Sequence, residues 1–130
     1  MATYKTTNDI VTTVFTLLSS ISTAKYKNSK PTLAQPDEYI VINTLGVNAD
    51  VMQKCRVNVN CHVKDINQGQ GVGFVPNDTR LKALTESVLS ILKKVSTTTY
   101  LIDFEGQETI RENSINEHYS NLKFSFKQIN

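Results

Sequence analysis

Residues 55–64 alternate strictly between apolar and polar side chains, and this run constrains the fold more than any other stretch of the chain. Five apolar and five polar positions take turns: Cys55, Val57, Val59, Cys61 and Val63 against Arg56, Asn58, Asn60, His62 and Lys64. A period of two is the geometry of a β-strand, in which successive side chains point to opposite faces of the sheet. The run therefore predicts a strand with one face against a core and the other against solvent or a partner.

Two other stretches carry apolar residues at the three- and four-residue steps of an amphipathic helix. The first, about 9–24, follows Asn8 and Asp9, which are good capping residues. The second is capped by Asn77 or Asp78 and extends to Val95. The apolar stripes of the two predicted helices are Ile10, Val14, Leu17 and Ile21, and Leu81, Leu84, Val88, Ile91, Leu92 and Val95.

Three further segments have the character of strands. Residues 38–43 are apolar on both faces, which is typical of a strand in the middle of a sheet. Two more strands are expected at about 98–105 and 117–128, the last with Leu122, Phe124 and Phe126 on one face. Because the connections at 44–50 and 106–116 are too short for a crossover helix, we expect antiparallel pairing.

The elements then follow the order helix, strand, strand, helix, strand, strand. This order predicts an α+β fold, a four-stranded antiparallel or mixed sheet with two helices on one face. Residues 1–130 are expected to form one domain, since a chain of this length can bury a core without disulfides or metal. Two segments are expected to be exposed: a connector at 25–37 with lysines 25, 27 and 30, and a flexible glycine-containing loop at 65–77.

The composition excludes several classes of protein. The longest apolar runs fall far below the roughly 18 residues of a membrane-spanning helix. The N-terminus is polar and lacks the apolar stretch of a signal peptide, which favours cytosolic synthesis. A net charge of +2 is too small to indicate a polyanion partner by itself. Thr, Asn and Ser make up 37 of the 130 residues, so much of the surface must be uncharged and hydrogen-bonding.

The two cysteines do not indicate a redox or metal site. Cys55 and Cys61 lie on the same face of one strand, so their Cα atoms are about 20 Å apart, whereas a disulfide requires less than about 7 Å. We expect two buried, inert thiols. His62 lies on the opposite face, which excludes a Cys–His ligand pair and favours a solvated or interfacial histidine.

No catalytic or cofactor motif emerges. The glycines at 69, 71 and 73 lack the spacing of a dinucleotide fingerprint, and no Gly-Lys-Ser/Thr follows them. Asp103 and Glu105 are expected on a solvated face, with Glu112 and Glu117 in the next loop, so no acid–base pair converges. We predict no enzyme activity, cofactor or metal. The glycine loop could instead become ordered on a partner through Val72 and Phe74.

The arrangement resembles the tail terminator and tail completion family of long-tailed bacteriophages, which includes related neck and head–tail connector proteins. The resemblance covers nearly the whole chain. It rests on an N-terminal helix, the strand Glu38-Tyr39-Ile40-Val41-Ile42-Asn43, the alternating strand Arg56 to Val63, a helix beginning Asn77-Asp78-Thr79-Arg80-Leu81, and two C-terminal strands. The long loop at 66–76 departs from the pattern, which leaves the subfamily open.

The resemblance implies a virion protein of the tail or neck, made in the bacterial host's cytoplasm. Family members form rings, commonly hexamers, that cap the tail tube and meet the neck or connector, and DNA passes through the lumen. For this chain we expect an interface or lumen face and a docking loop. The expected face comprises Arg56, Asn58, Asn60, His62 and Lys64, and the expected docking loop comprises Gly69, Gly71, Val72, Gly73 and Phe74.

Two alternatives stay open. A small sheet-based module could bind nucleic acid or another ligand on the same polar face, although the outward positions of the alternating strand carry no aromatic residue for base stacking. An enzyme would need a cleft that brings Asp103, Glu105 or His62 against another titratable group.

Overall fold

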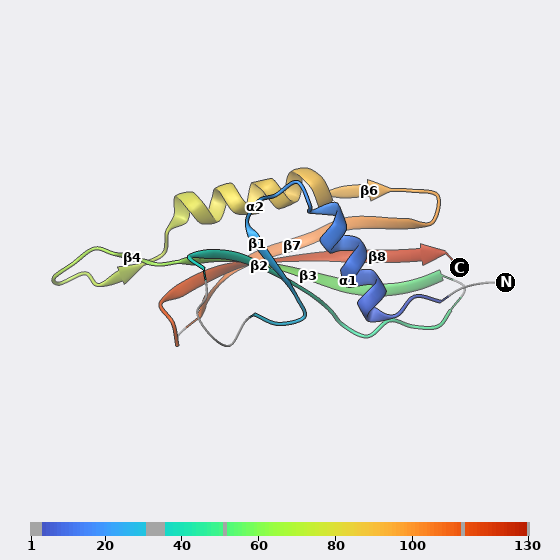
Figure 1. The fold of residues 1–130 in the computed structure, drawn as a ribbon, viewed down its shortest axis with the longest axis horizontal. Coiled ribbons are helices and arrows are strands. Elements are labelled where there is room, and N and C mark those ends of the chain that lie inside the picture. The colour runs from blue at the N-terminus through green and yellow to red at the C-terminus, as the bar shows by residue number, and fades with distance from the viewer. Residues whose placement is uncertain (1–3, 31–35, 51, 113, 130) are drawn as a thin grey trace.

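The computed structural model describes residues 4–30, 36–50, 52–112 and 114–129 as two helices on a six-stranded mixed sheet (Figure 1). The strand order across the sheet is β1-β2-β3-β8-β7-β6, and β4 and β5 form a separate hairpin. In chain order the elements are α1 (Thr7–Leu17), β1 (Ala24–Lys27), β2 (Glu38–Thr44), β3 (Met52–Lys64), β4 (Ile66–Asn67), β5 (Phe74–Val75), α2 (Asp78–Leu92), β6 (Lys94–Ser96), β7 (Tyr100–Glu112) and β8 (Glu117–Ile129).

The α+β class and the two helices are confirmed, whereas the four-stranded sheet and its element order are wrong. Two short edge strands, β1 and β6, complete the sheet. β1 runs parallel to β2 within the predicted connector, and β6 pairs with β7 where the second helix was expected to end. Strands of four and three residues are too short to show a periodicity of their own. The sheet is mixed because the β1–β2 pair is parallel.

The centre of the sheet is the antiparallel pair β3 and β8, which are in register from Met52 opposite Ile129 to Lys64 opposite Glu117. The predicted alternating strand is therefore confirmed and is three residues longer at its start. β2 lies between β1 and β3, so its predicted central position is also confirmed. Its side chains from 39 to 42 are buried on both faces.

Helix α1 is shorter than the apolar periodicity predicts. It begins after Thr6 rather than after Asn8 or Asp9, because the Thr6 and Asp9 side chains form a reciprocal capping box with each other's backbone N–H. It ends at Leu17, and the next residues, Ser19, Ser20, Ser22 and Thr23, are poor helix formers. Of the predicted connector at 25–37, residues 31–35 lie outside the described part of the chain.

Helix α2 confirms its predicted start. The Asn77 side chain accepts a hydrogen bond from the Arg80 backbone N–H, as an N-cap does. The helix ends at Leu92, so Val95, expected in its stripe, belongs to β6. Neither of these two helices, within the residues the structure describes, is long and apolar enough to cross a membrane.

The C-terminal hairpin is longer than predicted. β7 continues to Glu112 through a register shift between Phe104 and Gly106, so most of the expected loop at 106–116 is strand. Glu112 and Glu117 face each other as the last ladder pair instead of lying in a loop. This half of β7 is polar on both faces, and such a strand shows no apolar alternation in the sequence.

Both helices cover the same face of the sheet. Ile10 and Val14 of α1 and Leu84 and Val88 of α2 belong to one buried cluster with the odd-numbered side chains of β3 and with Phe124 of β8. The even-numbered side chains of β3 therefore lie on the other face, which neither helix covers. The single helix-covered core agrees with the expected alternation of the strand.

Both cysteines are buried free thiols, as expected. Burial raises the pKa of Cys55 to about 11 and that of Cys61 to about 12. At pH 8 only about one in a thousand Cys55 groups is then a thiolate, the form that attacks thiol reagents. We expect the native protein to react with a thiol reagent at least about 100-fold more slowly than the urea-unfolded protein. Fast modification of native protein would contradict the buried placement.

Candidate functional site

The sheet face away from the helices carries the side chains expected to form an interface or lumen. Register places Asn58 beside Asn43 and Lys123, and Asn60 beside Asn121. These amides bond to one another: the Asn121 Nδ2 donates to Asn60 Oδ1 at 2.6 Å, and the Asn58 Nδ2 donates to Asn43 Oδ1 at 3.0 Å. A hydrogen-bonded amide ladder thus crosses three strands of this polar face.

Four cations on or beside the polar face have carboxylate partners. Arg56 lies 3.2 Å from Glu105, and Lys123 lies 3.3 Å from Glu108. At the end near the β7–β8 turn two more pairs form, Lys64 with Asp37 at 3.4 Å and Lys30 with Glu112 at 3.3 Å. Such exposed pairs contribute at most about 1 kcal/mol each to stability. Their main effect is to leave the face polar but nearly neutral.

His62 is buried on this face rather than solvated. Its ring is stacked between Tyr39 and Tyr119, with centroid distances of 4.5 Å and 4.6 Å. The Glu117 Oε1 lies 2.8 Å from the His62 Nδ1 and accepts a hydrogen bond from the Tyr39 hydroxyl at 2.5 Å. Tyr39, His62 and Glu117 are 0%, 5% and 3% exposed. We call Tyr39, His62, Glu117 and Tyr119 the histidine cluster.

The histidine cluster joins three strands of the sheet through buried hydrogen bonds and ring stacking. Burial lowers the pKa of His62, although Glu117 opposes that shift, so the imidazole is neutral at pH 7 and Nδ1–H donates to Glu117. Burial, together with the bond to Glu117, raises the pKa of Tyr39, which keeps its hydroxyl protonated. The Glu117 Oε1 thus holds the Tyr39 hydroxyl and the His62 Nδ1 together at a site that is almost completely buried.

The lowered pKa of His62 makes stability depend on pH in a defined window. The unfolded chain binds a proton at His62 near pH 6.5 and the folded chain only at lower pH, so protonation favours unfolding. The stability from neutral His62 is complete above pH 6.5 and is lost as the pH falls through its folded pKa, by at most about 1.4 kcal/mol per pH unit. Urea unfolding at pH 7.5, 6.5 and 5.5 measures this slope.

Two variants test whether His62 is the source of this pH dependence of stability. His62→Gln is expected to flatten the slope between pH 6.5 and 5.5 relative to the native chain. Glu38→Gln, which removes an exposed carboxylate bonded to Arg80 at 2.7 Å and 2.8 Å, is expected to keep that slope. Equal slopes in the native and His62→Gln proteins would show that His62 does not carry the effect.

A second histidine–carboxylate pair joins the same strands on the opposite face. The His118 Nδ1 lies 2.6 Å from Asp65 Oδ1, and the Asp65 side chain is completely buried. Asp65 directly precedes β4, and its backbone N–H donates to the Asn116 carbonyl. The pair therefore fastens the point at which the β4–β5 hairpin leaves the sheet.

The β4–β5 hairpin lies within the glycine-containing loop expected at 65–77. Ile66 pairs with Val75 and Asn67 with Phe74, and the hairpin extends from the sheet past the start of α2 (Figure 1). We call residues 66–75 the arm. Its exposed apolar side chains are Ile66, Val72 and Phe74, which are 42%, 60% and 46% exposed. The arm contains no charged residue.

The three glycines of the arm shape its turn. Gly69, Gly71 and Gly73 all have φ between 78° and 85°, a region that strains residues with a Cβ. The turn closes through the Gln68 N–H, which donates to the Gly73 carbonyl, and the Gly73 N–H, which donates to the Gly69 carbonyl. The glycines thus set the bend of the hairpin and present Val72 near its tip.

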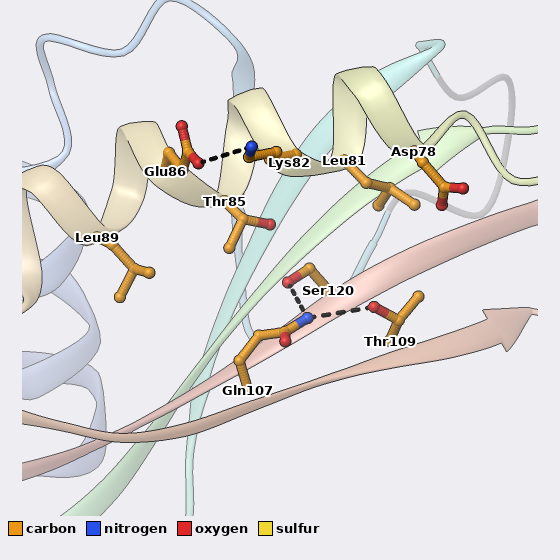
Figure 2. A pocket seen from close by; sticks show the side chains of 9 residues that line it. All are labelled: Asp78, Leu81, Lys82, Thr85, Glu86, Leu89, Gln107, Thr109 and Ser120. Carbon is orange, nitrogen blue, oxygen red and sulfur yellow. Dashed lines mark hydrogen bonds and ion pairs between the residues drawn. The ribbon is translucent and has the colours of Figure 1, made fainter.

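A groove of about 460 Å³ runs between α2 and the polar half of the β7–β8 hairpin. Figure 2 shows Leu81, Thr85 and Leu89 directed from the helix toward the sheet, with Gln107, Thr109 and Ser120 facing them. The Gln107 Nε2 donates to both Ser120 and Thr109. Asp78, Lys82 and Glu86 form its charged rim, where Lys82 and Glu86 lie 3.8 Å apart.

The other candidate clusters are engaged within the chain. The Lys25 ammonium donates to the Ile21 and Thr23 carbonyls, and the Lys27 ammonium lies 5.0 Å from the centre of the Phe15 ring. Asp103 lies 3.3 Å from Lys94, as a partly exposed carboxylate on the sheet. No group of three or more His, Cys, Asp or Glu side chains suited to a metal ion occurs in the described part of the chain.

The sequence matches no protein-family profile, and no curated protein matches it significantly.

Sequence reasoning located the polar face and the arm but missed the histidine cluster and the groove. The alternation places His62 opposite the core, yet the stacking partners come from β2 and β8, whose register no local pattern reveals. One signal is present: Tyr39 lies in a strand that is apolar on both faces, which indicates burial on the polar side as well.

Proposed function

We propose that this chain is a structural subunit that assembles with copies of itself into a ring. In its most specific form, this proposal is the role that the sequence resemblance implies, a phage virion protein at the neck or tail end. Such a protein caps the tail tube, or joins it to the capsid connector, and DNA passes through the lumen of the ring. In this role the protein acts by burial and hydrogen bonding between subunits, without a cofactor.

The arm is the observation that carries this proposal. Three large apolar side chains, Ile66, Val72 and Phe74, are exposed together on a short hairpin that extends away from the core. Exposed apolar residues on a projection from the core are typical of a surface that contacts a protein partner. A hairpin of this length is stable only marginally by itself in water, which favours its completion by a partner.

The polar face supports the lumen part of the proposal. Its amide ladder and its paired cations give a hydrated surface of nearly balanced charge. A strongly basic lumen would hold the phosphate backbone and oppose DNA movement, because each phosphate contact releases counterions and adds affinity. A balanced face allows passage. Arg56, Asn58, Asn60 and Lys64 are our proposed lumen or interface residues, with His62 as their buried support.

A nucleic-acid or ligand-binding module is the competing hypothesis. Tyr26 and Tyr119 lie partly exposed on the polar face and favour it, since aromatic rings stack on bases. Measured binding to a single-stranded oligonucleotide distinguishes the two. A salt-dependent affinity that falls when Arg56 and Lys64 are both replaced by Ala would favour the module, whereas the ring subunit is expected to bind weakly and to lose little in the variant.

The tail-end role has its own test. Purified protein is mixed with tail tubes assembled from the tube protein of the same phage or prophage and imaged by negative-stain microscopy. We expect density at one end of the tubes. Tubes with bare ends at saturating protein would contradict the terminator role, and the order of genes around the coding sequence provides an independent check.

A further inference from the structure

We propose that the arm of one copy docks in the groove beneath α2 of a second copy. This inference deepens the proposed function, because it names the two surfaces that would join neighbouring subunits. It rests on the residues of the arm and of the groove, which are different parts of the chain and complement each other in chemistry.

The groove offers an apolar wall and a hydrogen-bonding wall. Leu81 and Leu89 of α2 provide the apolar side, and Gln107, Thr109 and Ser120 of the hairpin provide amide and hydroxyl groups on the other. The Gln107 amide already donates to Thr109 and Ser120, so part of the hydrogen-bonding capacity of this wall is used within the chain. An occupant with both apolar and amide groups would therefore match it better than a wholly apolar one.

The arm has this composition. Val72 and Phe74 supply apolar side chains, while Asn67, Gln68 and Gln70 supply amides. The absence of charge in the arm also fits the groove, because Asp78 and Glu86 at the rim would repel an acidic segment and Lys82 a basic one. The volume of about 460 Å³ is sufficient for the Val72 and Phe74 side chains.

The geometry favours a second copy. The arm extends beyond the N-terminal end of α2, whereas the groove runs alongside the helix from Asp78 to Leu89 (Figure 1). The Asp65–His118 pair fixes the strand end from which the arm leaves the sheet, and from there the arm leads away from the groove of its own chain. Because arm and groove are different surfaces, the contact is head-to-tail, the type that generates a ring when its rotation closes.

Disulfide trapping tests the contact directly. Val72→Cys places a thiol on the arm and Thr85→Cys places one in the groove; both positions are accessible, while Cys55 and Cys61 are buried. The two single variants are mixed under mild oxidation and the disulfide-linked dimer is quantified. The matched control pairs Val72→Cys with Thr98→Cys, an exposed threonine on the β6–β7 turn.

We expect at least about fivefold more dimer from the Val72→Cys and Thr85→Cys mixture than from the control mixture. A ring in microscopy with no such excess would overturn the arm–groove contact and leave the ring subunit standing. An excess dimer with only open chains would support the contact and contradict the ring. Absence of any self-association would contradict both.

A second variant avoids dependence on thiol geometry. Phe74→Asp puts a charge on the exposed arm, and we expect association at least about tenfold weaker with an unchanged circular dichroism spectrum, since the side chain is not part of the core. Association equal to that of the native chain would overturn the docking contact.

Discussion

Replacing Phe124 with alanine is expected to lower the free energy of unfolding by about 3–5 kcal/mol, the largest effect of a single substitution in this account. Phe124 is completely buried on the central strand β8, between Val57 of β3 and Phe104 of β7. Its ring lies 5.6 Å from that of Phe104. The loss has two parts, the apolar surface that is no longer buried and the cavity left in the core between the sheet and the helices.

The matched control is the neighbouring residue on the same strand. Lys123 points to the polar face and lies 3.3 Å from Glu108, with both side chains more than a third exposed. Lys123→Ala is expected to cost less than about 1 kcal/mol. Urea unfolding of the two variants measures both values. Similar costs at 123 and 124 would contradict the assignment of one face to the core and the other to the surface.

Replacing Glu117 with alanine is the second large effect, a loss of about 3 kcal/mol of unfolding free energy. Glu117 Oε1 is the acceptor for both the Tyr39 hydroxyl and the His62 Nδ1–H. All three residues are buried, so the substitution leaves two donors without their protein acceptor away from solvent. A buried donor left unpaired costs about 1–3 kcal/mol, which is why this polar change approaches the cost of a core deletion.

Glu117→Gln separates the hydrogen bonds from the charge. Glutamine keeps a side-chain oxygen at the same distance from the backbone, so both donors keep an acceptor. We expect this variant to retain more than half of the stability lost by Glu117→Ala, measured by the same urea unfolding. Equal losses in the two variants would show that the negative charge matters more than the acceptor.

The sequence predicts those elements whose secondary structure is indicated by a single local periodicity of apolar residues. β3 was predicted from ten alternating residues, and α2 from its stripe and the Asn77 cap. The six-stranded sheet could not be predicted, because β1 and β6 owe their strand conformation to pairing with β2 and β7. The polar end of β7 became a strand for the same reason: its partner β8 is fixed by Phe124 and its neighbours.

The candidate site also contains features that the sequence predicts and features that it does not. The polar positions of β3 follow from the alternation, and the exposure of Val72 and Phe74 was anticipated. Three closely spaced glycines predict a loop at 65–77, and in the structure their positive φ angles bend a short hairpin within it. The burial of His62 depends on Tyr39, Glu117 and Tyr119, which only the register of three strands brings together.

The measurement that tests the central claim most directly is the mass of the purified native chain in solution. Light scattering coupled to size-exclusion chromatography, over a concentration series and confirmed by negative-stain images, reports the number of copies. We predict a discrete closed oligomer, a whole-number multiple of 14.6 kDa, seen as rings with a central hole. A mass of one chain at every concentration, up to about 1 mM, would contradict the account.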